Sequence, residues 1–265
     1  MKRRSFVKAS LLGTVAGSVS PLVNKAASTE INKNNQQWYE LRVYTFKNAG
    51  QQKLTEDYFE KAAIPALNRL GSKNIGVFKE LKPGEQAKLF VIIPFPSIEA
   101  FTAAEDKLNK DNVYKEAASS YLNATAAEPA YERIESSLLR AFPHMPEIVS
   151  FKGKPRIFEL RRYESATEMA GKKKIDMFDD KGEIEIFKRT GLAPVFFGET
   201  IIGGLRPNLT YMLMFENMAA HDANWKVFGS DPEWKRIKSV PGYADTEIVS
   251  HITNNFLVPT EFSQV

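Results

Sequence analysis

Two short segments of the chain repeat a set of side chains that could bind an anionic ligand. Each has the pattern aromatic-Glu-Leu-Arg-x-Tyr, at residues 39–44 and 158–163. An arginine can hold a carboxylate or phosphate with two parallel hydrogen bonds, and a nearby tyrosine hydroxyl could add another. The candidate ligand-binding residues of these segments are Arg42, Tyr44, Arg161 and Tyr163.

The same segments also have a structural interpretation, which we favour. On a strand, Glu40 and Glu159 share a face with the arginines and could form Glu–Arg pairs across neighbouring strands. Such a pair contributes between a fraction of a kcal/mol and about 1 kcal/mol. The tyrosines would then be packing residues of the sheet.

A second group of candidate residues is aromatic and lies in the second half of the chain. Its members are Phe196, Phe197, Trp225, Phe228 and Trp234. They either form a core cluster or line an apolar pocket between a sheet and its helices, where a flat organic ligand could bind. Met212, Met214 and Met218 would suit either arrangement.

Three residues near this aromatic group are candidates for catalysis. They are Glu199, Tyr211 and Arg161. Glu199 or Glu216 could act as a general base if burial raised its pKa, and Tyr211 could donate a hydroxyl hydrogen bond. An enzyme of this kind would be a cofactor-independent oxygenase or isomerase.

Several other chemistries are excluded or disfavoured. The chain has no cysteine, which excludes disulfides, thiolate nucleophiles and Cys-ligated metals. The three histidines, His144, His221 and His251, have no metal-binding spacing. The sequence also lacks a Ser-His-Asp order, a phosphate loop and a dinucleotide-binding glycine motif. We therefore expect no metal and no cofactor, with a histidine ligand to haem or a metal as the alternative left open.

The first 27 residues resemble a twin-arginine export signal, the alternatives being an ordinary secretory signal or a disordered basic tail. Residues 2–8 are Lys-Arg-Arg-Ser-Phe-Val-Lys, a short apolar run follows, and Ala26 and Ala27 supply small residues for cleavage. The apolar run is too short for a membrane span, which needs about 20 residues. We expect export to the periplasm or beyond, with no integral span after the signal is removed.

Removal of this segment changes the charge of the protein. The whole chain has 36 basic and 32 acidic residues, a net charge of +4. Five of the basic residues and none of the acidic ones lie in the first 27 positions, so the remaining chain carries −1. A nearly neutral protein does not attract nucleic acid strongly, and we expect no such partner.

The two motifs belong to two copies of one longer unit. Matching residues recur at offsets of 119 or 120, as in Phe59 and Phe178, or Gly71 and Gly191. Each copy predicts the order strand, helix, strand, strand, helix, strand. The first copy has these at 38–46, 51–70 (interrupted at Pro65), 76–81, 88–95, 97–123 (broken near 109–112) and 133–142. The second has them at 156–163, 172–190, 195–202, 209–215, 219–238 and 246–258.

This order predicts an α+β fold made of two ferredoxin-like β-α-β-β-α-β units. Because helices cover one face of each sheet, the open faces can pack together as a dimeric α/β barrel within one chain. The expected boundaries are 1–27 for the signal, 28–37 and 144–155 for linkers, and 38–143 and 156–260 for the repeats. A further homodimer is compatible with this arrangement.

Several segments of the chain together match the pattern of a known family: 39–44, 64–67, Gly71, 76–78, 158–163, 196–199, 207–211 and 225–234. On these residues the chain resembles the NIPSNAP family, within the dimeric α/β-barrel (ferredoxin-like) superfamily. The resemblance implies the fold and membership, but no single activity. The first repeat departs from the pattern, with Asp-Asn-Val-Tyr at 111–114 where the second has Asp-Pro-Glu-Trp at 231–234.

Two functions remain open from the sequence. In the first, the protein binds a small organic molecule in an aromatic pocket of the second repeat, with or without transforming it. In the second, it is a non-catalytic interaction or assembly protein whose repeats form only a scaffold. A roomy cavity with convergent Arg, Tyr and Glu side chains would favour the first.

Overall fold

The computed structural model describes residues 36–151, 153 and 156–265. The predicted export signal and most of the first linker lie outside these residues. Within the described part of the chain, no helix is long and apolar enough to cross a membrane.

The first repeat has the predicted order of elements. Its strands are β1 (Trp38–Thr45), β2 (Gly76–Glu80), β3 (Lys88–Phe95) and β4 (Arg133–Ala141). Its helices are α1 (Ala49–Tyr58), the π-helix η2 (Phe59–Ala63), α2 (Ile64–Arg69), α3 (Ile98–Lys110), α4 (Asn112–Ala117) and α5 (Ser119–Leu122). Pro65, which lacks a backbone donor, lies in the first turn of α2, directly after the π-helix.

The second repeat follows the same order with a different division of its helices. Its strands are β5 (Ile157–Glu164), β6 (Ala193–Ile202), β7 (Asn208–Phe215) and β8 (His251–Pro259). Its helices are α6 (Glu168–Asp179), α7 (Glu183–Arg189), α8 (Met218–Ser230), α9 (Pro232–Lys238) and α10 (Asp245–Ile248).

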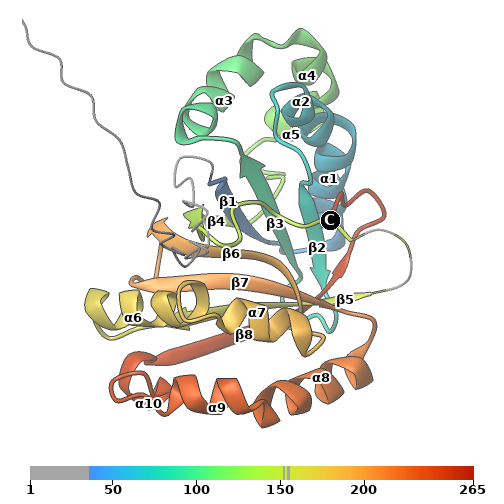
Figure 1. Cartoon of the computed structure of the whole chain (residues 1–265). Coiled ribbons are helices and arrows are strands. Elements are labelled where there is room, and N and C mark those ends of the chain that lie inside the picture. Colours follow the sequence, from blue (N-terminus) through green and yellow to red (C-terminus); the bar gives the residue numbers. More distant parts are fainter. Residues whose placement is uncertain (1–35, 152, 154–155) are drawn as a thin grey trace, which may run out of the picture. The chain divides into compact units, whose positions relative to one another are not determined.

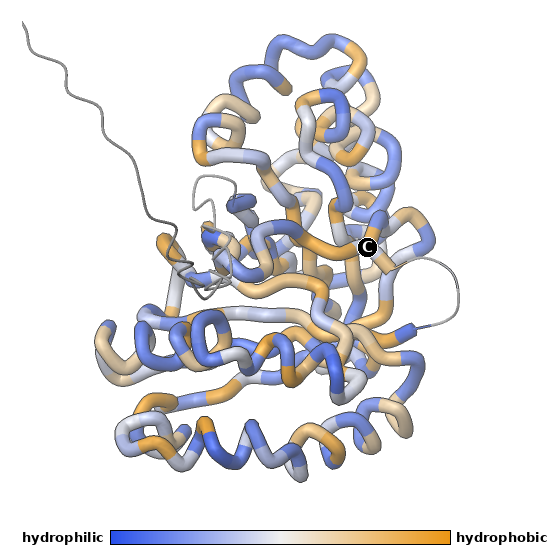
Figure 2. Tube along the Cα trace, in the orientation of Figure 1, coloured by the Kyte–Doolittle hydropathy of each residue, from blue (hydrophilic) through white to orange (hydrophobic). Residues whose placement is uncertain are grey.

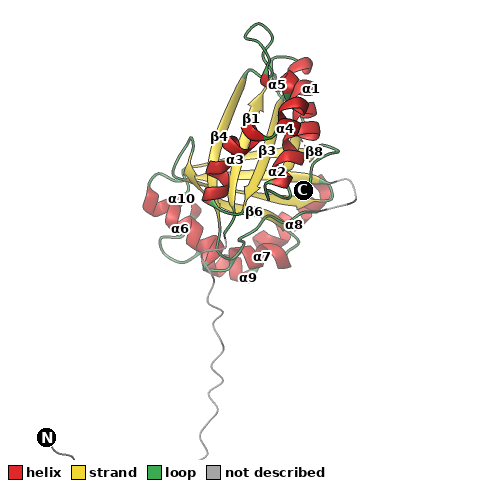
Figure 3. Cartoon of the chain, turned by 90° about the horizontal axis from the view of Figure 1, so that it is seen from above, coloured by secondary structure: helices red, strands yellow, loops and turns green. Residues whose placement is uncertain are grey.

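All eight strands form one closed antiparallel barrel in the order β1-β3-β2-β8-β5-β7-β6-β4. Each repeat contributes four adjacent strands in the ferredoxin-like order, and the two sheets join where β2 pairs with β8 and β4 pairs with β6. The helices of the two repeats cover opposite outer sides of the barrel, α1–α5 at the top and α6–α10 at the bottom of Figure 1. Figure 3 shows the strands enclosed between these helices. The predicted intrachain dimeric α/β barrel is confirmed.

The apolar side chains form three layers that follow from the alternation of the strands. The barrel interior contains Tyr39, Phe78, Phe158 and Phe196, all completely buried. The other two layers lie between each sheet and its own helices. Apolar segments accordingly run along the central strands, while the outermost helical turns are largely hydrophilic (Figure 2). Each fully buried aromatic side chain contributes about 2 kcal/mol.

Several predicted elements have different bounds in the structure, including two in the second repeat. The helix predicted at 172–190 is two helices: the first ends at Asp179, and Gly182, in a left-handed conformation (φ 88°), is the N-cap of the second. The last strand begins at residue 251 and not at 246, because α10 occupies the preceding residues. His251 is therefore the exposed first residue of β8 and not a mid-strand residue.

Candidate functional site

The repeated Glu-Leu-Arg-x-Tyr segments place an ion pair under the helices of each repeat. On β1, Tyr39 contributes to the barrel interior, while Tyr44 packs on the helix side with the Glu40–Arg42 pair. The pairing differs from the prediction, because glutamate and arginine pair along one strand and not across two. Residues two apart on a strand point to the same face, so the arginine can reach back to the glutamate.

In the first repeat the pair is bidentate. Arg42 Nε and Nη2 donate to the two carboxylate oxygens of Glu40 at 2.7 and 2.8 Å. Ser136 on β4 donates to Glu40 Oε1 at 2.9 Å, and Arg42 Nη1 donates weakly to the Tyr44 hydroxyl at 3.4 Å. Burial works against the charge of Arg42, but the hydrogen bonds and charge of Glu40 raise its pKa. The arginine is therefore a permanent cation whose charge Glu40 balances.

A cavity of about 370 Å³ lies above this pair, between the sheet and the helices of the first repeat. Glu40, Arg42, Ile93 and Phe95 come from the strands below it, and the remaining lining residues come from the helices. Those helical residues are Tyr58, Phe59, Ala63, Leu67, Phe101, Thr102, Ala104, Glu105, Leu108, Asn109, Tyr114 and Leu122. The exposed residues Thr102, Glu105 and Asn109 mark the side open to solvent.

Tyrosine hydroxyls form the second polar group of the cavity. The hydroxyl oxygens of Tyr58 and Tyr114 are 2.9 Å apart, and the ring of Tyr121 stacks on Tyr58 with centroids 3.9 Å apart. Burial, and then the neighbouring Tyr114, raise the pKa of Tyr58 well above its usual value. The Tyr58 hydroxyl therefore stays neutral and can donate or accept a hydrogen bond. Tyr58 directly precedes the π-helix, and Phe59 and Ala63 of that helix also line the cavity.

The second repeat has the same pair in a closed environment. Arg161 Nη1 donates to Glu159 Oε1 at 2.6 Å, and Nη2 donates to the Tyr163 hydroxyl at 3.0 Å. The Tyr211 hydroxyl donates to Tyr163 at 3.2 Å, and burial raises the pKa of Tyr211 far above its usual value. Neither Tyr211 nor Glu159 is more than 1% exposed.

Trp225 on α8 occupies the space above this second pair. Its ring lies over the Arg161 guanidinium at 4.7 Å, and its Nε1 donates to Glu159 Oε2 at 3.0 Å. His221 Nε2 is 3.3 Å from the same oxygen. The second pair is accordingly less exposed to solvent than the first. The side chain of Arg42 is 29% exposed but that of Arg161 only 14%, and that of Glu40 is 9% exposed but that of Glu159 only 1%.

Comparison with known proteins agrees with this duplicated geometry. The NIPSNAP family model matches the chain twice, over residues 39–146 and 158–264. The chain belongs to the NIPSNAP family. A comparison with curated protein sequences finds no match.

Solved structures share the fold of this NIPSNAP protein over most of its length. A proposed monooxygenase from Lactobacillus acidophilus has a TM-score of 0.56 and 13% identity, covering 84% of this chain and 94% of its own. A proposed monooxygenase from Fusobacterium nucleatum has a TM-score of 0.55 and 8% identity, with coverages of 85% and 93%. An anthrone oxidase-like protein has a TM-score of 0.50 and 9% identity, with coverages of 86% and 93%. At these identities the likeness shows the fold alone.

The other aromatic residues predicted for a pocket lie in two separate layers. Phe196 and Phe197 are consecutive on β6, so Phe196 points into the barrel, where it meets Tyr39, and Phe197 stacks on Tyr211 on the helix side. Trp234 packs on Phe228 with centroids 4.7 Å apart. Phe228 and Trp234 belong to the core between the second sheet and its helices, and Trp225 packs against that core.

The three candidates for catalysis do not meet at one place. Tyr211 and Arg161 are both part of the covered network of the second NIPSNAP repeat. Glu199 instead forms an ion pair with Arg140 on β4 at 2.9 Å, where both side chains are partly exposed.

Sequence reasoning missed a buried cation beside the same network. Lys174 on α6 is 1% exposed, and its Nζ is 3.0 Å from Asp245 and 3.4 Å from Glu183. The ammonium group also lies over the ring of Tyr163 at 5.3 Å. Burial raises the pKa of Glu183 to about 7, although Lys174 acts to lower it. The sequence shows Lys174 only as part of a run of three lysines, which is typical of a solvated surface.

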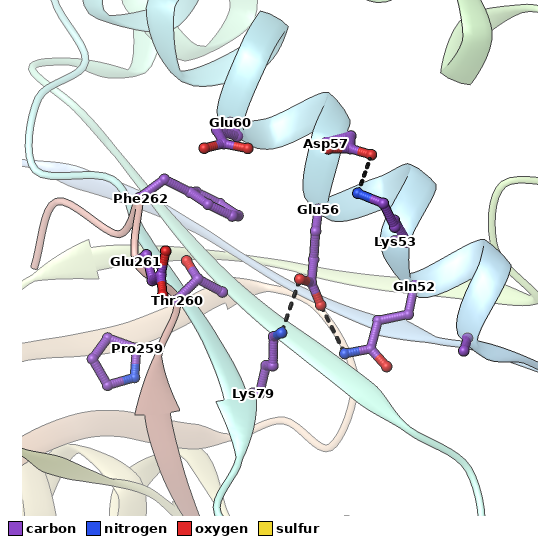
Figure 4. Close-up of a pocket in the computed structure, with 11 residues that line it drawn as sticks. Gln52, Lys53, Glu56, Asp57, Glu60, Lys79, Pro259, Thr260, Glu261 and Phe262 are labelled. Atoms are coloured by element: carbon purple, nitrogen blue, oxygen red, sulfur yellow. Dashed lines mark hydrogen bonds and ion pairs between the residues drawn. The ribbon is translucent and has the colours of Figure 1, made fainter.

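Two further clusters have partners of their own. His144, Asp179 and Asp180 offer ligand atoms within 4.8 Å of one another, but Asp179 already accepts the His144 backbone N–H at 2.9 Å and lies 3.0 Å from its ring. A groove of about 580 Å³ runs between α1 and the C-terminal segment (Figure 4). There, Lys79 pairs with Glu56 at 2.9 Å and Lys53 pairs with Asp57 at 2.8 Å.

Proposed function

We propose that this NIPSNAP protein binds a small organic molecule in the cavity of its first repeat. The observation that carries the proposal is that cavity, with the Glu40–Arg42 pair on one side and the Tyr58–Tyr114 hydroxyl pair on another. Its volume of about 370 Å³ falls in the range of ligand pockets, which combine apolar walls with a few polar groups. The sequence pointed to the second repeat, where Trp225 fills the corresponding space.

The chemistry of the lining favours binding over catalysis. Burial keeps the Tyr58 hydroxyl neutral, and the cation Arg42 is bound to Glu40. These groups can orient a ligand through hydrogen bonds, but they do not form a nucleophile with an adjacent base. Two structural neighbours are named proposed monooxygenases, which fits a small organic ligand, although they share only the fold.

The test is ligand binding by the protein and by a variant with a filled cavity. Native mass spectrometry of protein purified from its own host, followed by calorimetry with a panel of small organic compounds, should find a ligand at one site per chain. Ala104 is buried and lines the cavity, so Ala104→Phe should abolish that binding. Ala117→Phe on the exposed face of α4 is the matched control and should bind normally.

Two results would refute the proposal. If no compound binds, the scaffold function is the better conclusion. If a compound binds equally well to Ala104→Phe and to the control, its site lies elsewhere on the protein.

We also propose that residues 1–27 direct export by the twin-arginine pathway. The support is the sequence Lys-Arg-Arg-Ser-Phe-Val-Lys at positions 2–8. A reporter fused after residue 27 should be exported, and replacement of both Arg3 and Arg4 by lysine should prevent it. Export of the double variant at the normal level would refute the assignment.

A further inference from the structure

The two repeats can be matched residue by residue around the cavity. Helices α3 and α8 each have 13 residues, at an offset of 120, and each begins after a side-chain cap, Ser97 in one and Asn217 in the other. The contacts confirm the match: Phe101 packs on Phe95 at 5.3 Å, and its counterpart His221 packs on Phe215 at 4.9 Å. The counterpart of Trp225 is therefore Glu105.

Trp225 makes three kinds of contact with the second repeat. Its flat ring lies over the Arg161 guanidinium, its single N–H donates to Glu159, and its edges meet the rings of Phe187 and Phe228. Together these contacts recognise a planar apolar ring with one hydrogen-bond donor. A guanidinium under a ring face and a carboxylate opposite an N–H group are both favourable arrangements.

The first repeat has the same recognising groups but lacks the indole. Glu105 is exposed at the open side of the cavity, and Leu67 and Leu108 replace the two phenylalanines. Among the residues that the structure describes, no ring lies over Arg42 as Trp225 lies over Arg161. Glu40 Oε2 accepts one hydrogen bond, from Arg42, and an oxygen of this kind can accept a second.

We propose that the ligand of the first repeat occupies the position that Trp225 occupies in the second. The ligand class is then a planar aromatic molecule with one N–H or O–H donor, of the indole or phenol type. Its ring would lie on Arg42 and its donor would bind Glu40. An anionic ligand is disfavoured, because its charge would face the Glu40 carboxylate. This inference rests on the proposed function and specifies its ligand.

Calorimetry with matched probes tests the donor. We expect 2-naphthol to bind about tenfold or more tightly than 2-methoxynaphthalene, which has no donor, and than 2-naphthoate, which is anionic. Equal binding of the first two probes, or tighter binding of naphthoate, would overturn the inference while leaving the cavity a binding site.

Substitutions at the matched helix positions Glu105 and Trp225 test where the ligand binds. Glu105→Trp places the same indole over Arg42, so it should weaken 2-naphthol binding at least tenfold, whereas Asp106→Trp on the exposed face should not. Trp225→Ala should add a second site, raising the stoichiometry from one to two. Unchanged binding by Glu105→Trp would overturn the proposal. Binding of 2-naphthol to Trp225→Ala but not to the unaltered protein would refute the proposed function of the first repeat alone.

Discussion

Trp225 should stabilise the second repeat by covering a buried ion pair, and its removal measures that contribution. In Trp225→Phe the ring contacts with Phe187 and Phe228 remain, but the hydrogen bond to Glu159 is lost. A hydrogen bond to a charged group contributes about 1.5–3 kcal/mol, so we expect a loss of about 2 kcal/mol.

Trp225→Ala should cost more because it also removes the ring. Truncation of a fully buried aromatic residue costs about 3–5 kcal/mol, and the stacking on Arg161 adds to the contacts that are lost. Trp225 is only partly buried, and water entering the vacated space would solvate Glu159. We therefore expect about 3–4 kcal/mol in total.

Urea unfolding followed by far-ultraviolet circular dichroism is the appropriate assay, since the substitution removes a fluorophore. Glu105→Ala is the matched control at the equivalent position of the first repeat, and it should change the free energy of unfolding by less than about 0.5 kcal/mol. A loss below about 1 kcal/mol for Trp225→Ala would refute the reasoning. Equal losses for the phenylalanine and alanine variants would show that the ring contacts contribute nothing.

Three further changes test other parts of the structure. Burial raises the pKa of Glu183 from 4.5 to about 7 in the folded protein, so the folded state binds this proton more tightly than the unfolded state. The free energy of unfolding therefore falls as pH rises between these values. Glu183→Gln should reduce this fall by up to about 3 kcal/mol, measured by urea unfolding at pH 5 and pH 8. Gly182→Ala should cost about 1 kcal/mol, because alanine disfavours a φ of 88°, whereas Gly84→Ala should change stability little. Tyr58→Phe should cost about 1–2 kcal/mol by leaving the Tyr114 hydroxyl without its partner. The double variant Tyr58→Phe/Tyr114→Phe should then lose less free energy of unfolding than the two single variants together, and additive losses would contradict the pairing.

The sequence predicted the barrel because the information for it is local and repeated. Alternation along β1 separates Tyr39, which lies in the barrel, from Tyr44, which packs under the helices, and the offset of 119 carries the same separation to β5. The break near Gly182 could also have been found, since glycine is favoured where helices begin or end. The partner of Arg42 could not be predicted from the sequence, because a glutamate on the same strand and one on a neighbouring strand produce the same pattern of residue types.

The candidate site was harder to locate, because a cavity forms where side chains are small or absent. The aromatic residues of the second repeat stand out in the sequence, and the structure uses Trp225 to fill space with them. The cavity instead adjoins Glu105, Leu67 and Leu108, none of which is unusual by itself. Only the comparison of matched positions, Trp225 against Glu105, indicates where volume has been lost.

The two repeats compensate differently for the hydration that a buried Glu–Arg pair loses. A Glu–Arg pair placed under helices loses hydration, and the mutual attraction of the charges recovers that loss only when their remaining hydrogen-bonding groups are satisfied. In the second repeat Trp225 donates to Glu159 Oε2 and covers the guanidinium, so these two contacts are made without any ligand. In the first repeat the same pair is left 29% and 9% exposed beside a cavity. A molecule that binds the Glu40–Arg42 pair gains the contacts that Trp225 makes in the second repeat. We therefore expect ligand binding in the first repeat, where no described residue makes these contacts, and added stability in the second, where Trp225 makes them.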